Sequence, residues 1–218
     1  MYIAIEGVIG VGKTTLARLL QPSFDARLLL EVFEENPFLS DFYEDRERYA
    51  FQTQMFFLLS RYHQQRMKVP ELIEASDYLI ADYTFEKDAI FAESNLDGDE
   101  LDMYYRVHEA LAEKIEIPDL IVYLTANTDV LMRRIAFRDR HYERNMERDY
   151  IDELNQVYEK FFSEKKESKA PILKIDTDQL DYVADESNLE WVEDRIRQAL
   201  RVPPYQTELP MVVKESRA

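Results

Sequence analysis

One short stretch near the start of this chain carries more structural information than any other: Gly7-Val8-Ile9-Gly10-Val11-Gly12-Lys13-Thr14. It fits the pattern G-x-x-x-x-G-K-[ST] and lies between an apolar run at 2–5 and a helix-like stretch that begins at Thr15. Backbone N–H groups of such a loop converge on a polyphosphate, Lys13 can reach the β and γ oxygens, and the Thr14 hydroxyl can ligate Mg²⁺. The following helix points its positive end at the anion. A chance glycine-rich turn is the alternative, but the flanking strand and helix favour binding of ATP with Mg²⁺ by residues 7–15.

The composition indicates one domain. The chain has 218 residues, 46% of them hydrophobic, and no long Pro/Gly/Ser-rich linker divides it, so we expect a domain at 1–200 and a C-terminal tail at 201–218. The absence of cysteine excludes disulfides and thiolate metal sites. Glu6 interrupts the apolar N-terminal run too early for a signal peptide or a membrane span, which indicates a cytoplasmic protein with no membrane partner.

The net charge of −17 argues against a nucleic-acid polymer as partner, because binding such a polymer depends on basic surfaces. A small anionic ligand in a local basic pocket remains possible.

Short apolar runs alternate with helix-like segments along the chain. We expect strands at about 2–5, 27–31, 78–82, 119–124 and 171–175. We expect helices at about 13–21, 46–67, 86–95, 99–115, 128–139, 149–166 and 187–200. Almost wholly apolar strands are typical of a parallel sheet that is covered on both faces. The pattern predicts a three-layer α/β fold of the P-loop kinase type, with a central parallel sheet, flanking helices and an Arg-rich lid.

A cluster of basic residues stands out in this acidic chain. Its members are Arg133, Arg134, Arg138, Arg140, Arg144 and Arg148. A solvated helix face, balanced by neighbouring acids, would explain it without any function. Transfer of a phosphoryl group, however, depends on cations placed around that group. In a chain that already carries a triphosphate loop, the cluster therefore favours a lid that closes over the phosphates.

Two predicted strands are followed by carboxylates. Asp82 ends the strand at 78–82, where an acid can hold Mg²⁺ opposite Thr14, and Glu31 ends the strand at 27–31, where it can accept a proton from an attacking hydroxyl. Ligands of open α/β sheets bind at this end of the strands. A helix cap or a surface charge is the alternative for each acid.

The expected helix at 46–67 carries Gln54 and Arg61 among apolar neighbours. The two residues are about two turns apart and share one face, where an amide and a guanidinium could together recognise a nucleobase edge. From the helix alone, the simpler interpretation is that Gln54 and Arg61 lie at the polar margin of an amphipathic helix.

Taken together, these segments resemble the deoxynucleoside kinases over residues 1 to about 200. The resemblance depends on the loop at 7–14, Glu31, Asn36-Pro37-Phe38-Leu39, Phe42-Tyr43, Tyr49-Ala50-Phe51-Gln52-Thr53-Gln54, Arg61, Asp82-Tyr83-Thr84, Ile90-Phe91-Ala92-Glu93 and Arg134-Ile135-Ala136-Phe137-Arg138-Asp139-Arg140. Members of this family transfer the γ-phosphoryl group of a nucleoside triphosphate to the 5′-hydroxyl of a deoxynucleoside. The family also implies a homodimer.

The resemblance implies a role for each matching residue. Glu31 and Asp82 match the two catalytic acids, with Asp82 also on the magnesium side. The sugar 3′-hydroxyl would be bound by Tyr43 and Glu143, and the phosphates would be clamped by Arg134, Arg138 and Arg140. The base would be recognised by Gln54, Arg61 and Asp88 and stacked by Phe91, a set found in members that take purine deoxynucleosides or deoxycytidine.

One position departs from the family pattern. Tyr83 follows Asp82 where the family usually has an arginine that orients the acid corresponding to Glu31. Tyr83 would then face the substrate, and Lys87 would supply the missing positive charge. The stretch from Asp82 to Glu93 is most similar to bacterial deoxyguanosine kinases. We therefore expect deoxyguanosine as the preferred substrate and deoxyadenosine as the next.

Two alternatives remain open from sequence. A monophosphate kinase of the thymidylate type shares the loop and the lid, but its acceptor carries a phosphate that Glu31, Glu34 and Glu35 would repel. A nucleotide-dependent switch that binds a protein partner is the other alternative.

Overall fold

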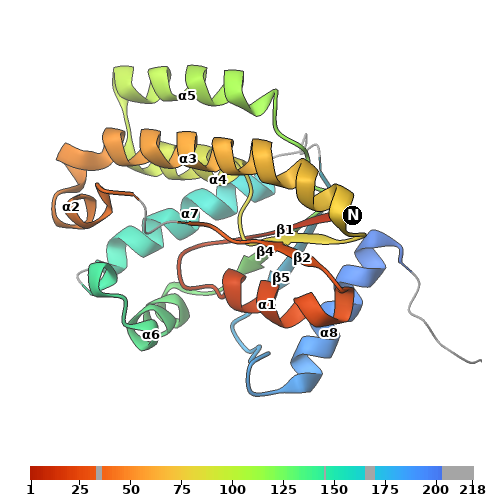
Figure 1. Cartoon of the computed structure of the whole chain (residues 1–218). Helices are drawn as coiled ribbons and strands as arrows, with labels where there is room; N and C mark the ends of the chain where they lie inside the picture. Colours follow the sequence, from red (N-terminus) through yellow and green to blue (C-terminus); the bar gives the residue numbers. More distant parts are fainter. Residues whose placement is uncertain (33–35, 145, 165–169, 203–218) are drawn as a thin grey trace, which may run out of the picture.

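The computed structural model describes residues 1–32, 36–144, 146–164 and 170–202 (Figure 1). The part of the expected tail at 203–218 lies outside the described residues. Within the described ranges, no helix is both long enough and apolar enough to cross a bilayer.

The core of the molecule is a five-stranded, all-parallel sheet in the order β2-β3-β1-β4-β5. The strands are β1 (Tyr2–Glu6), β2 (Arg27–Leu29), β3 (Leu79–Ala81), β4 (Leu120–Thr125) and β5 (Ile172–Asp176). The residues of β1 and β3 are all buried, as expected for strands covered on both faces. The five strands fall within the predicted segments to within two residues at either end, and β2 lies at one edge of the sheet.

Helices cover both faces of this sheet. They are α1 (Lys13–Phe24), α2 (Leu39–Glu44), α3 (Arg46–Ala75), α4 (Glu86–Asn95), α5 (Gly98–Ala112), α6 (Thr128–Arg138), α7 (Arg148–Glu164) and α8 (Glu186–Leu200), with a 3₁₀ turn η1 at His141–Glu143. Figure 1 shows α3, α4 and α7 on one side with α5 outside them, and α1 and α8 on the other side. The predicted three-layer α/β fold is confirmed.

Three features differ from the prediction made by periodicity. The short elements α2 and η1 were not predicted, because six and three residues are too few to establish a helical period. Helix α3 continues to Ala75, eight residues beyond its expected end, and it contains Pro70. Val69, one position before the proline, is almost wholly buried against β3, so packing holds this last part of the helix in place.

The parallel arrangement brings distant segments to one edge of the sheet. The loop at 7–12 follows β1, Glu31 lies two residues beyond the end of β2, and Asp82 follows β3 directly. Since β1, β2 and β3 are neighbours and run in the same direction, these three segments lie side by side at their carboxyl ends.

The loop after β1 depends on glycine for steric reasons. Gly7 has a φ of 148°, and a Cβ added there would lie 2.4 Å from the carbonyl oxygen of Leu124 in β4. Gly98, at the start of α5, also has a positive φ of 51°, but a Cβ there would meet no atom within 4 Å. Both positions therefore have a positive φ, which disfavours residues with a Cβ, but only at Gly7 would an added Cβ overlap a neighbouring atom.

This difference predicts unequal costs of substitution. Gly98→Ala should lower the free energy of unfolding by roughly 1–2 kcal/mol, the cost of a positive φ for a residue with a Cβ. Gly7→Ala should cost about 1–3 kcal/mol more, because the added methyl group overlaps a backbone atom. Urea denaturation of both variants measures the difference, and equal costs would contradict the steric argument.

Candidate active site

The glycine-rich loop and the start of α1 form one wall of a cavity of about 390 Å³. The Lys13 Nζ donates hydrogen bonds to the carbonyl oxygens of Gly7, at 2.6 Å, and Val8, at 3.1 Å, so the ammonium group lies across the loop. Burial and, to a smaller extent, the nearby Lys87 lower the pKa of Lys13 to about 8. An anion bound in the loop would favour the protonated form of this lysine.

Thr14 and Asp82 meet at the floor of the cavity. The Thr14 hydroxyl donates to Asp82 Oδ2 at 2.5 Å. A hydroxyl and a carboxylate are oxygen ligands suited to Mg²⁺, which is usually held by one or two protein groups together with water and phosphate oxygens. Among the described residues, no three His, Cys, Asp or Glu side chains gather as a metal cluster. The residues present therefore fit a Mg²⁺ ion that is shared with a nucleotide.

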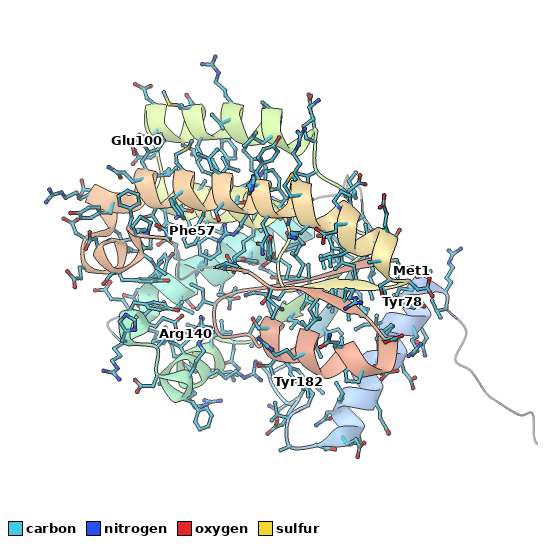
Figure 2. All side chains as sticks on the ribbon, in the orientation of Figure 1. Met1, Phe57, Tyr78, Glu100, Arg140 and Tyr182 are labelled. Atoms are coloured by element: carbon cyan, nitrogen blue, oxygen red, sulfur yellow. The ribbon has the colours of Figure 1, made fainter. Side chains whose placement is uncertain are left out.

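Most of the residues singled out from sequence line this cavity. They are Ile9, Gly10, Gly12, Lys13, Thr14, Thr15, Glu31, Tyr43, Arg61, Asp82, Lys87, Phe91, Arg138, Arg140 and Glu143. Four further lining residues were missed as site residues: Arg18, Leu39, Phe57 and Tyr142. Phe57, on α3, and Arg140, on the segment after α6, line the cavity from different sides (Figure 2). Phe57 could have been identified, because it shares a helix face with Gln54 and Arg61.

Glu31 lies at the centre of a buried ion-pair cluster. Its Oε1 accepts from Arg61 Nε at 2.8 Å and Arg61 Nη2 at 2.5 Å, and its Oε2 accepts from Lys87 Nζ at 2.5 Å. Burial alone would raise the pKa of Glu31, but the charges of Arg61 and Lys87 outweigh it and hold the pKa well below its ordinary value. The carboxylate is therefore ionised throughout the physiological pH range.

Asp82, unlike Glu31, accepts its hydrogen bonds from a hydroxyl and a backbone N–H and not from cationic side chains. One of its oxygens accepts from the Thr14 hydroxyl, and the other accepts from the backbone N–H of Glu31 at 2.8 Å. Asp82 thus links the N-terminal start of α1 to the segment after β2.

Arg61 also reaches toward the expected base-recognition residues. Its Nη1 donates to Asp88 Oδ1, and Asp88 is fully buried. Burial raises the pKa of Asp88, and the nearby Arg61 opposes this shift. Asp88 Oδ2 and the Oε1 of the buried Gln54 accept no hydrogen bond from any of the described residues. Gln54 and Asp88 do not line the cavity themselves, but Asp88 lies directly behind Arg61, which does.

The predicted lid arginines are divided between two places. Arg138 donates to both carboxylate oxygens of Glu143 from Nη2 at 2.7 Å, and Arg140 Nη1 lies 3.6 Å from Glu143 Oε1. Tyr142, between Arg140 and Glu143, stacks on Tyr43, with ring centroids 6.2 Å apart.

Arg134 is not brought together with Arg138 and Arg140 at the first cavity. Its guanidinium donates to the hydroxyl of Thr177 at 2.9 Å and to the carbonyl oxygens of Thr177 and Val11. It faces a second cavity on the outer side of the loop, which is bounded by residues 178–184. The expectation that the three arginines act as one clamp is therefore corrected.

Tyr83 is also not where we expected it. Its side chain has no exposed surface and packs beside Tyr2, Leu29 and Leu79. Its hydroxyl donates to Gln64 Oε1 at 2.6 Å. Because Tyr83 does not line the cavity, we withdraw it from the expected substrate contacts. Gly7, Val8 and Val11 of the loop also lie outside the lining, because their side chains or Cα atoms are buried.

Comparison with known proteins agrees with this geometry. The family model for deoxynucleoside kinases matches residues 3–201. The chain belongs to the deoxynucleoside kinase family. Among relatives of this kinase, a deoxyguanosine kinase from Bacillus subtilis (strain 168) is 33% identical over 201 residues, which cover 91% of this chain and 97% of the relative. A deoxyadenosine/deoxycytidine kinase from the same organism is 30% identical over 202 residues, which cover 89% of this chain and 90% of the relative.

Solved structures give the same result for this kinase. The structure of deoxyadenosine kinase from M. mycoides with bound dCTP has a TM-score of 0.77 and 25% identity, covering 91% of this chain and 100% of that chain. As a member of this family, the kinase is a phosphotransferase. Its family decides against both the monophosphate kinase and the protein-binding switch.

The lowered pKa of Lys13 predicts a pH dependence of nucleotide binding. A bound triphosphate raises this pKa, so affinity is complete below about pH 8 and is lost as the pH rises through the pKa of the free protein, by up to about tenfold per pH unit. Calorimetric titration with a non-hydrolysable ATP analogue, in two buffers of different ionisation enthalpy, measures the affinity and the proton uptake.

Lys13→Arg is the matched control, because a guanidinium stays protonated over this range. Its affinity should not change between about pH 7 and pH 9. Wild-type affinity that is equally flat would contradict the assignment.

Proposed function

We propose that this kinase transfers the γ-phosphoryl group of ATP to the 5′-hydroxyl of a purine deoxynucleoside, with deoxyguanosine preferred over deoxyadenosine. The observation that carries the proposal is a pair of buried acceptors that have no hydrogen-bond donor among the described residues: Gln54 Oε1, two turns before Arg61 on α3, and Asp88 Oδ2, whose other carboxylate oxygen accepts from Arg61.

Two acceptors and a guanidinium suit guanine better than the other bases. Guanine offers an imino N–H and an adjacent amino group as donors, with O6 and N7 as acceptors for an arginine. Adenine and cytosine each offer only an amino group on the edge that pairs, and thymine offers one imino N–H. A buried acceptor left without a donor is costly, so the base that fills both acceptors should bind best.

The relatives support the chemical class but do not decide the base. The relative named deoxyguanosine kinase is 33% identical, and the one named deoxyadenosine/deoxycytidine kinase is 30% identical. Such a small difference does not separate purine preferences. The argument for deoxyguanosine therefore depends on the acceptors beside Arg61.

In the proposed reaction, Glu31 aligns the 5′-hydroxyl. As the new O–P bond forms, the bond from the γ-phosphorus to the bridging oxygen of ATP breaks, and the hydroxyl proton passes to Glu31. A carboxylate with so low a pKa is a weak base, but the loose transition state of phosphoryl transfer demands positioning more than proton removal. Asp82 and Thr14 would hold Mg²⁺, which neutralises charge on the phosphate oxygens when it is bound.

The other lining residues receive roles from their contacts. Tyr43 and Glu143 would bind the sugar 3′-hydroxyl, and Phe91 would stack on the base, close to the ammonium of Lys87 at 5.7 Å from the ring centroid. Arg138 and Arg140 would leave Glu143 for the phosphates. For Arg134 we propose a place beside the base of ATP, since the second cavity adjoins Gly10 and Gly12 from the outside.

The remaining expectations from sequence keep the status of proposals. One hydrophobic cluster joins buried residues from Ile3 to Ile196, which supports a single domain at 1–200. The homodimer and the cytoplasmic location stay predictions. Exposed apolar side chains on α3 and α5, among them Leu59, Met67 and Met103, are compatible with an interface between two copies.

A substrate panel tests the proposed base preference. Deoxyguanosine should give the highest kcat/KM, followed by deoxyadenosine, with deoxycytidine and thymidine lower, in a coupled assay of ADP release. Gln54→Met should reduce kcat/KM for deoxyguanosine by roughly 10- to 100-fold, because a donor of guanine loses its buried acceptor, and should change thymidine turnover much less. Arg61 is unsuitable for this test, because its loss also releases Glu31.

Gln52→Met is the matched control, since Gln52 lies on the same helix but is exposed. It should leave the panel unchanged. A uniform loss over all nucleosides in Gln54→Met would count against recognition of the base.

The lid assignment predicts a large effect at Arg140. Arg140→Ala should lower kcat by on the order of a hundredfold or more, because a cation at the transferred phosphoryl group is lost, while thermal stability changes little. Arg144→Ala is the control, since Arg144 belongs to the same segment but forms an exposed pair with Asp139. Steady-state kinetics of both variants would refute the assignment if they turned over alike.

A further inference from the structure

A single peptide unit, which joins Leu30 to Glu31, is held from both sides by side chains. Its N–H, on Glu31, donates to Asp82 Oδ1 at 2.8 Å. Its carbonyl oxygen, on Leu30, accepts from Gln64 Nε2 at 2.9 Å. Gln64 in turn accepts from the Tyr83 hydroxyl at 2.6 Å. The backbone that carries Glu31 is thus tied to β3 through Asp82 and to α3 through Gln64.

The position of this peptide in the sheet explains why side chains are needed. β2 ends at Leu29, and as an edge strand it pairs with β3 alone. Beyond its end, none of the strands in the described part of the chain lies where it could donate to the Leu30 carbonyl. A backbone carbonyl at a partly buried position needs a donor, and Gln64 provides one from the helix that covers this face.

The Leu30 carbonyl determines which way the amide of Gln64 points, and Tyr83 binds the other end of that amide. The Leu30 oxygen can only accept, so Gln64 must present its N–H group there and its oxygen to Tyr83. The Tyr83 hydroxyl satisfies that oxygen as a donor. Burial raises the pKa of Tyr83 far above its ordinary value, so this proton is retained at any pH at which the enzyme works.

The alternation of side chains along β3 makes the arrangement possible. Leu79, Ala81 and Tyr83 belong to one packed cluster, together with Val69 of α3, whereas Asp82 opens into the active-site cavity. Successive residues of an extended segment point to opposite sides. Asp82 can therefore accept from the N–H of the neighbouring peptide, while Tyr83, on the opposite side, donates to the Gln64 that binds the carbonyl oxygen of the same peptide.

We propose that Tyr83 and Gln64 are positioning residues, which fix the backbone of Glu31 so that its carboxylate meets the acceptor hydroxyl. This inference rests on the role proposed above for Glu31. Arg61 and Lys87 fix the direction of the carboxylate, and the tether through Gln64 fixes the main chain from which the side chain extends. Small displacements of a reacting group cost large factors in rate, so the tether acts on turnover rather than on substrate affinity.

Steady-state kinetics of Tyr83→Phe, Gln64→Met and the double variant test the proposal. Tyr83→Phe removes only a hydroxyl, and Gln64→Met keeps the length of the side chain. We expect kcat to fall about fivefold in Tyr83→Phe and about tenfold in Gln64→Met, with the KM values of deoxyguanosine and ATP changed less than about twofold. Because both variants break the same tether, the double variant should be no slower than Gln64→Met.

Tyr123→Phe is the matched control for a buried hydroxyl, since Tyr123 is also almost wholly buried and its hydroxyl faces Glu159 on α7. Its kcat should equal that of the wild type. Thermal unfolding of every variant distinguishes lost positioning from lost folding. Wild-type kcat in both Tyr83→Phe and Gln64→Met would overturn the proposal, and so would multiplied effects in the double variant.

Glu31→Gln, measured in the same series, separates this proposal from the one on which it rests. If Glu31→Gln loses turnover while Tyr83→Phe and Gln64→Met do not, the tether alone is refuted. If Glu31→Gln retains wild-type kcat, the proposed role of Glu31 is itself wrong.

Discussion

The active site depends on one buried guanidinium. Arg61 donates to Glu31 with one part of its fork and to Asp88 with the other, and Lys87 adds a second cation at Glu31. Two carboxylate groups and two cationic side chains therefore neutralise one another's charge in a region from which water is largely excluded. Removing one partner of such a cluster leaves an uncompensated buried charge, which is far more costly than the pair is worth. The groups assigned to proton transfer and to base recognition are thus parts of one electrostatic unit.

The charge of the whole molecule contrasts with that of its cavity. The chain carries a net charge of −17, yet the cavity is lined by Lys13, Arg18, Arg61, Lys87, Arg138 and Arg140 against Glu31, Asp82 and Glu143. The net negative charge of the molecule disfavours the approach of polyanions, whereas this cavity concentrates positive charge. The charge distribution therefore favours binding of a nucleotide at the cavity. The all-parallel sheet makes that concentration of cations possible, because it brings the ends of β1, β2 and β3 together.

Much of this architecture could be read from the sequence, for identifiable reasons. The glycines, lysine and threonine of the loop from Gly7 to Thr14 have a fixed spacing, and the strands are nearly continuous apolar runs. The local sequence pattern was therefore sufficient to predict both the loop and the strands. Short elements such as α2 left no period to detect. Gln64 could not be identified, because its partners Leu30 and Tyr83 are 34 and 19 residues away and only the fold brings them together. Arg134 and Tyr83 were misplaced because adjacency in sequence does not reveal the direction of a side chain.

The pairing of the lid with Glu143 has a thermodynamic consequence. Without a ligand, the Glu143 carboxylate accepts hydrogen bonds from Nε and Nη2 of Arg138. The predicted lid is therefore paired with an anion of the protein itself. In the proposed reaction, phosphate groups that attract Arg138 and Arg140 would release Glu143, which would then have acceptor capacity free for a sugar hydroxyl. Binding of the nucleotide and binding of the deoxynucleoside would then be linked. Linkage is reciprocal, so whichever substrate bound first would raise the affinity for the second. One glutamate would thereby give the enzyme cooperativity between two different substrates within a single chain.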